Sequence, residues 1–187
     1  MNLANWISVV RIILVPFFIG AVVYYTPEKE YLRFAALLIF LIAVISDGVD
    51  GYIARTRKMK TRLGSFLDPM ADKLLLSSSF VTLALAHNMP MVIQLPFWMP
   101  ILVISRDIIL TLGALLVYVM TGDLKIAPSI MGKMTTFFQM VTIVSVLMQW
   151  PQANTIKDIA AFFTVASCFD YILKGSRLLG NINQHNS

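Results

Sequence analysis

Apolar stretches long enough to cross a lipid bilayer recur along nearly the whole of this 187-residue chain. A membrane-spanning helix needs about 20 predominantly apolar residues, because the hydrocarbon core of a bilayer is about 30 Å thick. Roughly six such helices with short connections fill the chain and leave no room for a separate soluble domain. We therefore expect a single all-α integral membrane domain over residues 1–187. The expected spans are Ile7–Tyr25, Leu32–Ile53, Phe66–Ala86, Phe97–Met120, Ser129–Trp150 and Ile156–Leu173.

The composition excludes two other classes of protein. The chain is 58% hydrophobic and 13% charged, whereas soluble domains are about 45–50% apolar and about 25% charged. A disordered chain would need low hydrophobicity and high net charge. The net charge of +5 comes from basic residues beside apolar segments. This placement fits membrane orientation better than binding of nucleic acid.

The basic residues predict how the chain is oriented in the membrane. The segment between the second and third spans has no acidic residue over 51–67, and the segment 87–95 has no lysine or arginine. Short loops rich in lysine and arginine stay in the cytoplasm. With six spans, both termini then face the cytoplasm, and the protein is a multi-pass protein of the cytoplasmic membrane. Arg11, inside the first span, is expected to extend to the cytoplasmic interface, and the alternative is that it reaches the lipid diphosphate. The basic residues of the loop are Arg55, Arg57, Lys58, Lys60 and Arg62.

Four aspartates lie at the cytoplasmic ends of the second and third spans. Asp47 and Asp50 are three residues apart, and Asp68 and Asp72 are four apart, so each pair shares one face of its helix. A short loop joins these helices, and we expect them to be antiparallel neighbours whose acidic faces can meet. Carboxylates at one depth in a membrane repel one another unless a cation binds them. Oxygen ligands favour magnesium or manganese.

Small residues alternate with these carboxylates. Gly51, Ala54 and Gly64 let a bulky ligand approach the helix backbone, although small residues also permit tight helix packing in membranes. Arg55 supplies a planar guanidinium that suits phosphate oxygens. Carboxylates, a divalent metal and an arginine together suggest a diphosphate substrate.

The same residues form a motif with fixed spacing. The chain reads Asp47-Gly48-Val49-Asp50-Gly51-Tyr52-Ile53-Ala54-Arg55, then eight residues, then Gly64-Ser65-Phe66-Leu67-Asp68-Pro69-Met70-Ala71-Asp72. It resembles the CDP-alcohol phosphatidyltransferase signature D-x-x-D-G-x-x-A-R, about eight residues, G-x-x-x-D-x-x-x-D, at all eight fixed positions. The resemblance extends to Asn5–Arg11, Arg106-Asp107 and Gly132-Lys133.

This resemblance implies a six-helix membrane enzyme, usually a homodimer, whose site opens to the cytoplasm. Asp47, Asp50, Asp68 and Asp72 would surround a divalent metal, magnesium or manganese. Asp72 would also be the general base that takes the proton of an acceptor hydroxyl, so that the phosphatidyl group of CDP-diacylglycerol is transferred and CMP leaves. The residues that would line the CDP pocket are Gly51, Ala54, Arg55 and Gly64.

Two acceptors stay open. The chain resembles the phosphatidylglycerophosphate synthase branch, which uses glycerol 3-phosphate, and this is the preferred hypothesis. That branch typically has cations where this chain has Ala114 and Thr135. Because an acceptor without a terminal phosphate needs fewer cations, the alternative is a cardiolipin synthase that uses phosphatidylglycerol. Lys73, Arg106 and Lys133 are the candidates for contact with acceptor or lipid phosphate.

A structural role for Arg106 would be a buried ion pair. Asp107 is not expected to be its partner, because adjacent residues on a helix point apart. A cation transporter is the remote alternative from another class of protein, since intramembrane acids can bind a passing ion. The position of the four aspartates at one membrane edge argues against it, because transport sites lie near the midplane.

Overall fold

A computed structural model describes the backbone of residues 3–57, 62–86, 94–121 and 129–185, and the side chains of residues 8–46, 70–86, 94–117, 119 and 129–176. Within these ranges the chain is all-helical: six long α-helices and one short 3-10 helix, with no strand. This confirms the all-α prediction. The helices are α1 Leu3–Val23, η1 Pro27–Lys29, α2 Tyr31–Arg57, α3 Arg62–Leu85, α4 Trp98–Thr121, α5 Ile130–Leu147 and α6 Ala153–His185.

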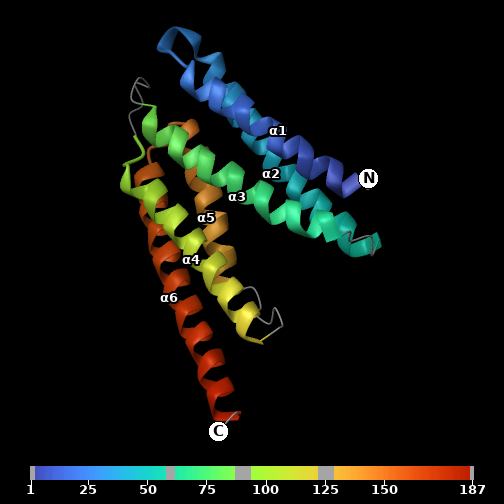
Figure 1. Cartoon of the computed structure of the whole chain (residues 1–187). Helices are drawn as coiled ribbons and strands as arrows, with labels where there is room; N and C mark the ends of the chain where they lie inside the picture. Colours follow the sequence, from blue (N-terminus) through green and yellow to red (C-terminus); the bar gives the residue numbers. More distant parts are fainter. Residues whose placement is uncertain (1–2, 58–61, 87–93, 122–128, 186–187) are drawn as a thin grey trace.

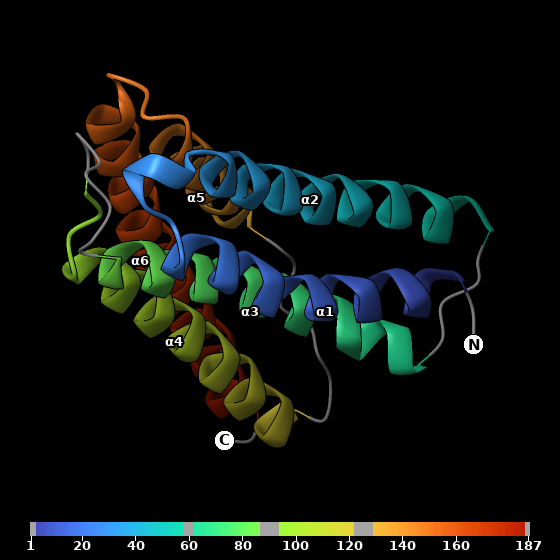
Figure 2. The same ribbon diagram turned by 90° about the horizontal axis from the view of Figure 1, so that it is seen from above.

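The helices alternate in direction along the chain. The starts of α1, α3 and α5 and the ends of α2, α4 and α6 lie at one end of the bundle, which we call the site end (Figure 1). Helices α1, α2 and α3 form one group and α4, α5 and α6 the other, and the two groups diverge toward the site end (Figures 1 and 2). The four aspartates of the motif lie in the site-end halves of α2 and α3.

Helix α1 packs against both α2 and α3. Its residues Phe18 and Val22 are buried on one face, and the rings of Phe18 and Phe40 of α2 have centroids 6.0 Å apart. Among the described residues, α2 and α3 each pack closely against α1 and make few contacts with each other. The two helices are antiparallel as expected. The expectation that their acidic faces meet falls on side chains outside the described part of the chain.

The helices that carry the motif are longer than the apolar runs that predicted them. We expected Arg55, Arg57 and Arg62 in the loop between the second and third spans. Instead α2 continues to Arg57 and α3 begins at Arg62, so all three arginines lie on helices. Arginine is a good helix former, and no proline interrupts these turns. The longer helices place Ala54, Arg55 and Gly64 on regular helical backbone.

Among the described residues, the apolar core lies toward the opposite end of the bundle. The core contains Phe40, Phe80, Met99 and Ile143. Outward faces are also apolar: Phe162 of α6 is 69% exposed and Val119 of α4 is 75% exposed. A surface of this kind is typical of contact with lipid or with another apolar partner.

Two of the helices are long and apolar enough to cross a membrane, judged on the residues that the structure describes. They are Trp98–Val117 within α4 and Ile130–Leu147 of α5, while α1 and α2 contain the shorter apolar segments Ser8–Val23 and Tyr31–Ser46. Helix α6 has 33 residues. It is about 50 Å long, which exceeds the thickness of a bilayer core.

Candidate active site

The motif residues lie on α2 and α3, in the halves of these helices that are nearer the site end. Asp47 and Asp50 are one turn apart on α2, and Asp68 and Asp72 are one turn apart on α3, all on helical backbone. Each pair therefore shares a helix face, as the spacing predicts. The following motif residues have side chains outside the described part of the chain: Asp47, Asp50, Gly51, Ala54, Arg55, Gly64 and Asp68.

Asp72 is the motif aspartate whose side chain is described. It is half-buried on α3, between the buried Ala71 and the buried Leu75 one turn later. No group of three or more potential metal ligands occurs among the described side chains, a set that includes Asp72 but not the other three aspartates. A metal site at the motif stays a prediction.

Lys73 connects α3 to α4. Its Nζ donates a hydrogen bond to Oγ1 of Thr111 over 2.7 Å, and the Thr111 hydroxyl donates to the backbone carbonyl of Asp107, also over 2.7 Å. Thr111 was not among the predicted site residues, because a single threonine in an apolar helix carries no periodic signal. The contact fixes the position of the residue next to Asp72.

Arg106 lies where α4, α5 and α6 approach one another. Its Nη1 is 2.8 Å from Oδ1 of Asp107, and its Nη2 donates to Oγ of Ser167 on α6 over 3.1 Å. The side chain is 12% exposed. The expectation that Asp107 would not pair with Arg106 is wrong: their Cβ atoms point apart, but the arginine side chain is long enough to bend round to the neighbouring carboxylate.

Helix α6 supplies polar groups that the sequence analysis did not assign to the site. Besides Ser167, it carries Asp170, whose Oδ2 accepts hydrogen bonds from Oγ of Ser129 over 2.5 Å and from Nζ of Lys174 over 2.7 Å. Ser129 immediately precedes α5. The carboxylate thus anchors the start of α5 to α6.

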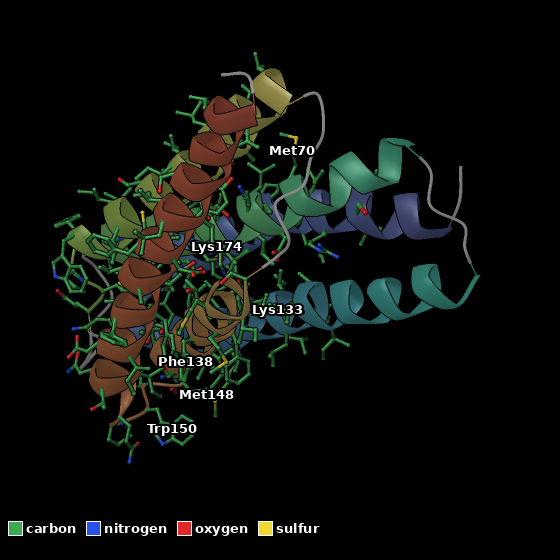
Figure 3. All side chains as sticks on the ribbon, turned by 90° about the horizontal axis from the view of Figure 1, so that it is seen from below. Met70, Lys133, Phe138, Met148, Trp150 and Lys174 are labelled. Carbon is green, nitrogen blue, oxygen red and sulfur yellow. The ribbon has the colours of Figure 1, made fainter. Side chains whose placement is uncertain are left out.

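Lys133 follows one turn later, in the first turn of α5. Its side chain is exposed, and Figure 3 shows it on the same face of the bundle as Lys174 of α6. The structure gives the Lys133 ammonium no hydrogen bond or ion pair to any described residue. Lys133 is therefore a cation at the site end that a ligand can reach.

Arg11 differs from its prediction. It was expected to extend to the membrane interface, but its side chain is 1% exposed and lies on the inner face of α1, one turn after the buried Ser8. The guanidinium is thus inside the bundle. The reason is that α1 has α2 and α3 packed against it, so this face contacts protein and not solvent.

The site end can bind an anion and can accept a proton. Asp72 supplies a carboxylate, while Lys73, Arg106 and Lys133 supply cations from α3, α4 and α5. These four residues come from three different helices. Such a set suits a substrate that carries phosphate groups and a reacting hydroxyl.

Comparison with known proteins gives a family match and several relatives. Residues 1–170 match the model of a family described as CDP-alcohol phosphatidyltransferase. A Bacillus subtilis protein named CDP-diacylglycerol–glycerol-3-phosphate 3-phosphatidyltransferase is 33% identical, over 97% of this chain and 99% of its own. A Haemophilus influenzae protein of the same name is 36% identical, over 97% of each chain. A Mycobacterium tuberculosis protein named probable phosphatidylglycerophosphate synthase is 33% identical, over 98% of this chain and 86% of its own.

Proposed function

The chain belongs to the CDP-alcohol phosphatidyltransferase family, and from this premise we propose that it transfers the phosphatidyl group of CDP-diacylglycerol to glycerol 3-phosphate. The products are phosphatidylglycerophosphate and CMP. The observation that carries the proposal is the match along nearly the whole chain to relatives named for this reaction. The complete motif on α2 and α3 supports it. Membership of a transferase family also explains the four aspartates better than the alternative hypothesis of a cation transporter.

The proposed reaction is a displacement at phosphorus. The acceptor hydroxyl gives its proton to the Asp72 carboxylate, and its oxygen forms a bond to the phosphorus that carries the diacylglycerol. The bond from that phosphorus to the oxygen of the CMP phosphate breaks, and CMP leaves with the electron pair. Asp72 suits the role of base because a half-buried carboxylate held on a helix can take a proton from a substrate hydroxyl within hydrogen-bond reach.

The donor set at the motif fits a divalent metal. Asp47, Asp50, Asp68 and Asp72 provide oxygen ligands in two pairs, each pair one helical turn apart, and hard cations prefer such ligands. These residues would hold magnesium or manganese, which when bound neutralises negative charge on a diphosphate. The residues proposed to line the CDP pocket beside them are Gly51, Ala54, Arg55 and Gly64.

The phosphate of the acceptor is proposed to bind the cations of α4 and α5. Arg106 has a fork of N–H donors, of which one bonds Asp107 and one bonds Ser167. A guanidinium can offer its other donors to a phosphate. Lys133 is exposed at the same end. Lys73 donates to Thr111, so we assign it a weaker role in phosphate binding.

Phosphatidylglycerol is the second candidate acceptor, since this chain has Ala114 and Thr135 where the glycerophosphate branch typically has cations. Thr135 is fully buried and donates to the carbonyl of Phe163 on α6 over 2.8 Å. A residue at position 135 thus faces α6 and not an open site, which weakens this argument for phosphatidylglycerol. A reaction that used it would give cardiolipin.

We further propose that the six helices form one domain in the cytoplasmic membrane. The exposed apolar faces and the two helices of spanning length support membrane insertion. The basic residues around the α2–α3 connection favour a cytoplasmic location for the site end and for both termini. The family resemblance suggests a homodimer.

Release of CMP by the purified protein tests the proposal. The protein in detergent is incubated with CDP-diacylglycerol, magnesium and either glycerol 3-phosphate or phosphatidylglycerol. We expect CMP release that depends on glycerol 3-phosphate and stops when a chelator removes the metal. Release with phosphatidylglycerol alone would favour the second acceptor, and turnover that survives chelation would exclude the metal.

A further inference from the structure

The guanidinium of Arg106 packs closely against the backbone of Gly132 on α5. A Cβ atom built on Gly132 would lie 3.3 Å from Nη2 of Arg106 and 3.8 Å from Oγ of Ser167. The first distance is tighter than nine in ten real Cβ contacts, and the second is an ordinary van der Waals contact. A side chain at position 132 therefore requires the guanidinium to shift by a few tenths of an ångström or more.

The backbone of α5 does not require a glycine at this position. Gly132 lies in the first turn of a regular helix, and its φ angle is outside the left-handed region. Alanine is the better helix former. Gly20 of α1 differs, because a Cβ there would have no neighbour within 4 Å. Gly132 therefore differs from Gly20, because a Cβ at position 132 would contact Arg106 whereas a Cβ at position 20 would contact nothing.

Ser167 completes the arrangement from α6. Its hydroxyl accepts the hydrogen bond of Nη2, while Asp107 accepts that of Nη1. The Nε atom of Arg106 is buried and has no hydrogen-bond partner among the described residues. The guanidinium is therefore held at its two terminal nitrogens, and it keeps donors for a further acceptor such as a phosphate oxygen.

We infer that Gly132 and Ser167 are positioning residues that fix the Arg106 guanidinium for the phosphate group of the acceptor. This inference rests on the proposed function, in which Arg106 binds that phosphate. Gly132 acts by leaving space and Ser167 by accepting a hydrogen bond. Neither residue contacts the reacting atoms in this account, and both act on acceptor affinity through Arg106.

Steady-state kinetics of Gly132 variants test the inference. Kcat and KM are measured for glycerol 3-phosphate and for CDP-diacylglycerol, with Gly132→Ala and Gly132→Val compared with the control variants Gly20→Ala and Gly20→Val. We expect the KM for glycerol 3-phosphate to rise about threefold in Gly132→Ala and about tenfold or more in Gly132→Val, because small displacements of a binding group are costly. The KM for CDP-diacylglycerol and both control variants stay near wild type.

Ser167 variants give a second test that does not crowd the helices. Ser167→Ala is expected to raise the KM for glycerol 3-phosphate about tenfold, because a hydrogen bond to a charged group is lost. Ser167→Thr keeps the hydroxyl and is expected to retain most of the affinity. In an Arg106→Lys background, Gly132→Val should add little further loss of kcat/KM, since residues that act through one group are not additive.

Two results would overturn the inference. One is a KM for glycerol 3-phosphate that stays at the wild-type value in Gly132→Val and Ser167→Ala. The other is an equal rise of both KM values, which would indicate a general packing defect. Failure of the proposed function is distinguishable, because it would show in the wild-type enzyme as an absence of CMP release with glycerol 3-phosphate.

Discussion

At the scale of single residues, the chemistry depends on what each charged side chain already contacts. Lys73 and Arg106 are both bonded to residues of the bundle, through Thr111 and through Asp107 and Ser167. Lys133 is exposed. Asp72 is the described carboxylate of the motif and is half-buried. These observations support the proposed roles of Asp72 in proton transfer and of the cations in phosphate binding.

The substitution Asp72→Asn is expected to lower the rate of CMP release by a factor of about 10² to 10⁴, because asparagine has the same shape but cannot accept the proton. The rate is measured with both substrates and magnesium at saturation. Asp158→Asn is the matched control, since Asp158 is 69% exposed beside Lys157 in the second turn of α6, at the opposite end of the bundle from the site. An Asp72→Asn enzyme with near-normal turnover would exclude the general base.

Residue patterns predicted the motif helices but not the partners of the charged groups. The aspartates, glycines and Arg55 stand at fixed spacings, and such a pattern is readable in a sequence. The contact of Arg106 with Ser167 joins residues 61 positions apart, and it depends on how α4 and α6 pack. The burial of Arg11 was not predicted for the same reason, since it depends on which helices pack against α1.

At the scale of helices, small residues set how closely α4 and α6 approach. A Cβ on Gly113 would lie 2.8 Å from Cε1 of Tyr171, so the tyrosine ring packs directly on the backbone of α4. Close approach through small residues is typical of helix pairs in membranes. The same two helices carry Arg106 and Ser167, so their spacing also determines the contact between those side chains.

The substitution Gly113→Ala is expected to destabilise the fold by about 1–3 kcal/mol, because the added methyl overlaps the ring of Tyr171. The change is measured as a lower midpoint of thermal unfolding in detergent. Gly20→Ala, where a Cβ meets nothing within 4 Å, is the control and should leave the midpoint unchanged or raise it. Equal midpoints for the two variants would contradict the close α4–α6 packing.

The turn between α5 and α6 offers a substitution that is expected to raise the stability of the fold. Gln149 has a φ of 53°, and the N–H groups of Gln149 and Trp150 donate to the carbonyls of Val146 and Ser145. This is a Schellman motif, in which glycine is favoured at the left-handed position. Gln149→Gly is therefore expected to stabilise the protein by up to about 1 kcal/mol. A lower midpoint of thermal unfolding would contradict this account of the turn.

At the scale of the whole molecule, the apolar runs predicted the order and number of the long helices. They did not predict which helices pack together, because a run of apolar residues can pack against any other. The placement of α1 against both α2 and α3 thus follows from side-chain fit, as with Phe18 and Phe40. The alternation of helix directions places the starts of α1, α3 and α5 and the ends of α2, α4 and α6 at one end (Figure 1).

Labelling of single cysteines tests the proposed orientation of that end. In a background with Cys168→Ser, Ser176→Cys near the site end is expected to react with an impermeant maleimide only after cells are opened. Glu28→Cys at the other end should react in intact cells. Both positions are exposed in the bundle. Labelling of Ser176→Cys in intact cells would reverse the orientation.

The identity of the lipid product tests the central claim most directly. The purified protein is given CDP-diacylglycerol, magnesium, isotope-labelled glycerol 3-phosphate and unlabelled phosphatidylglycerol together, and the lipids are analysed by mass spectrometry. We predict phosphatidylglycerophosphate that carries the label, formed in equal amount to CMP. Unlabelled cardiolipin as the product, or CMP without any new phosphatidyl lipid, would contradict the proposed function.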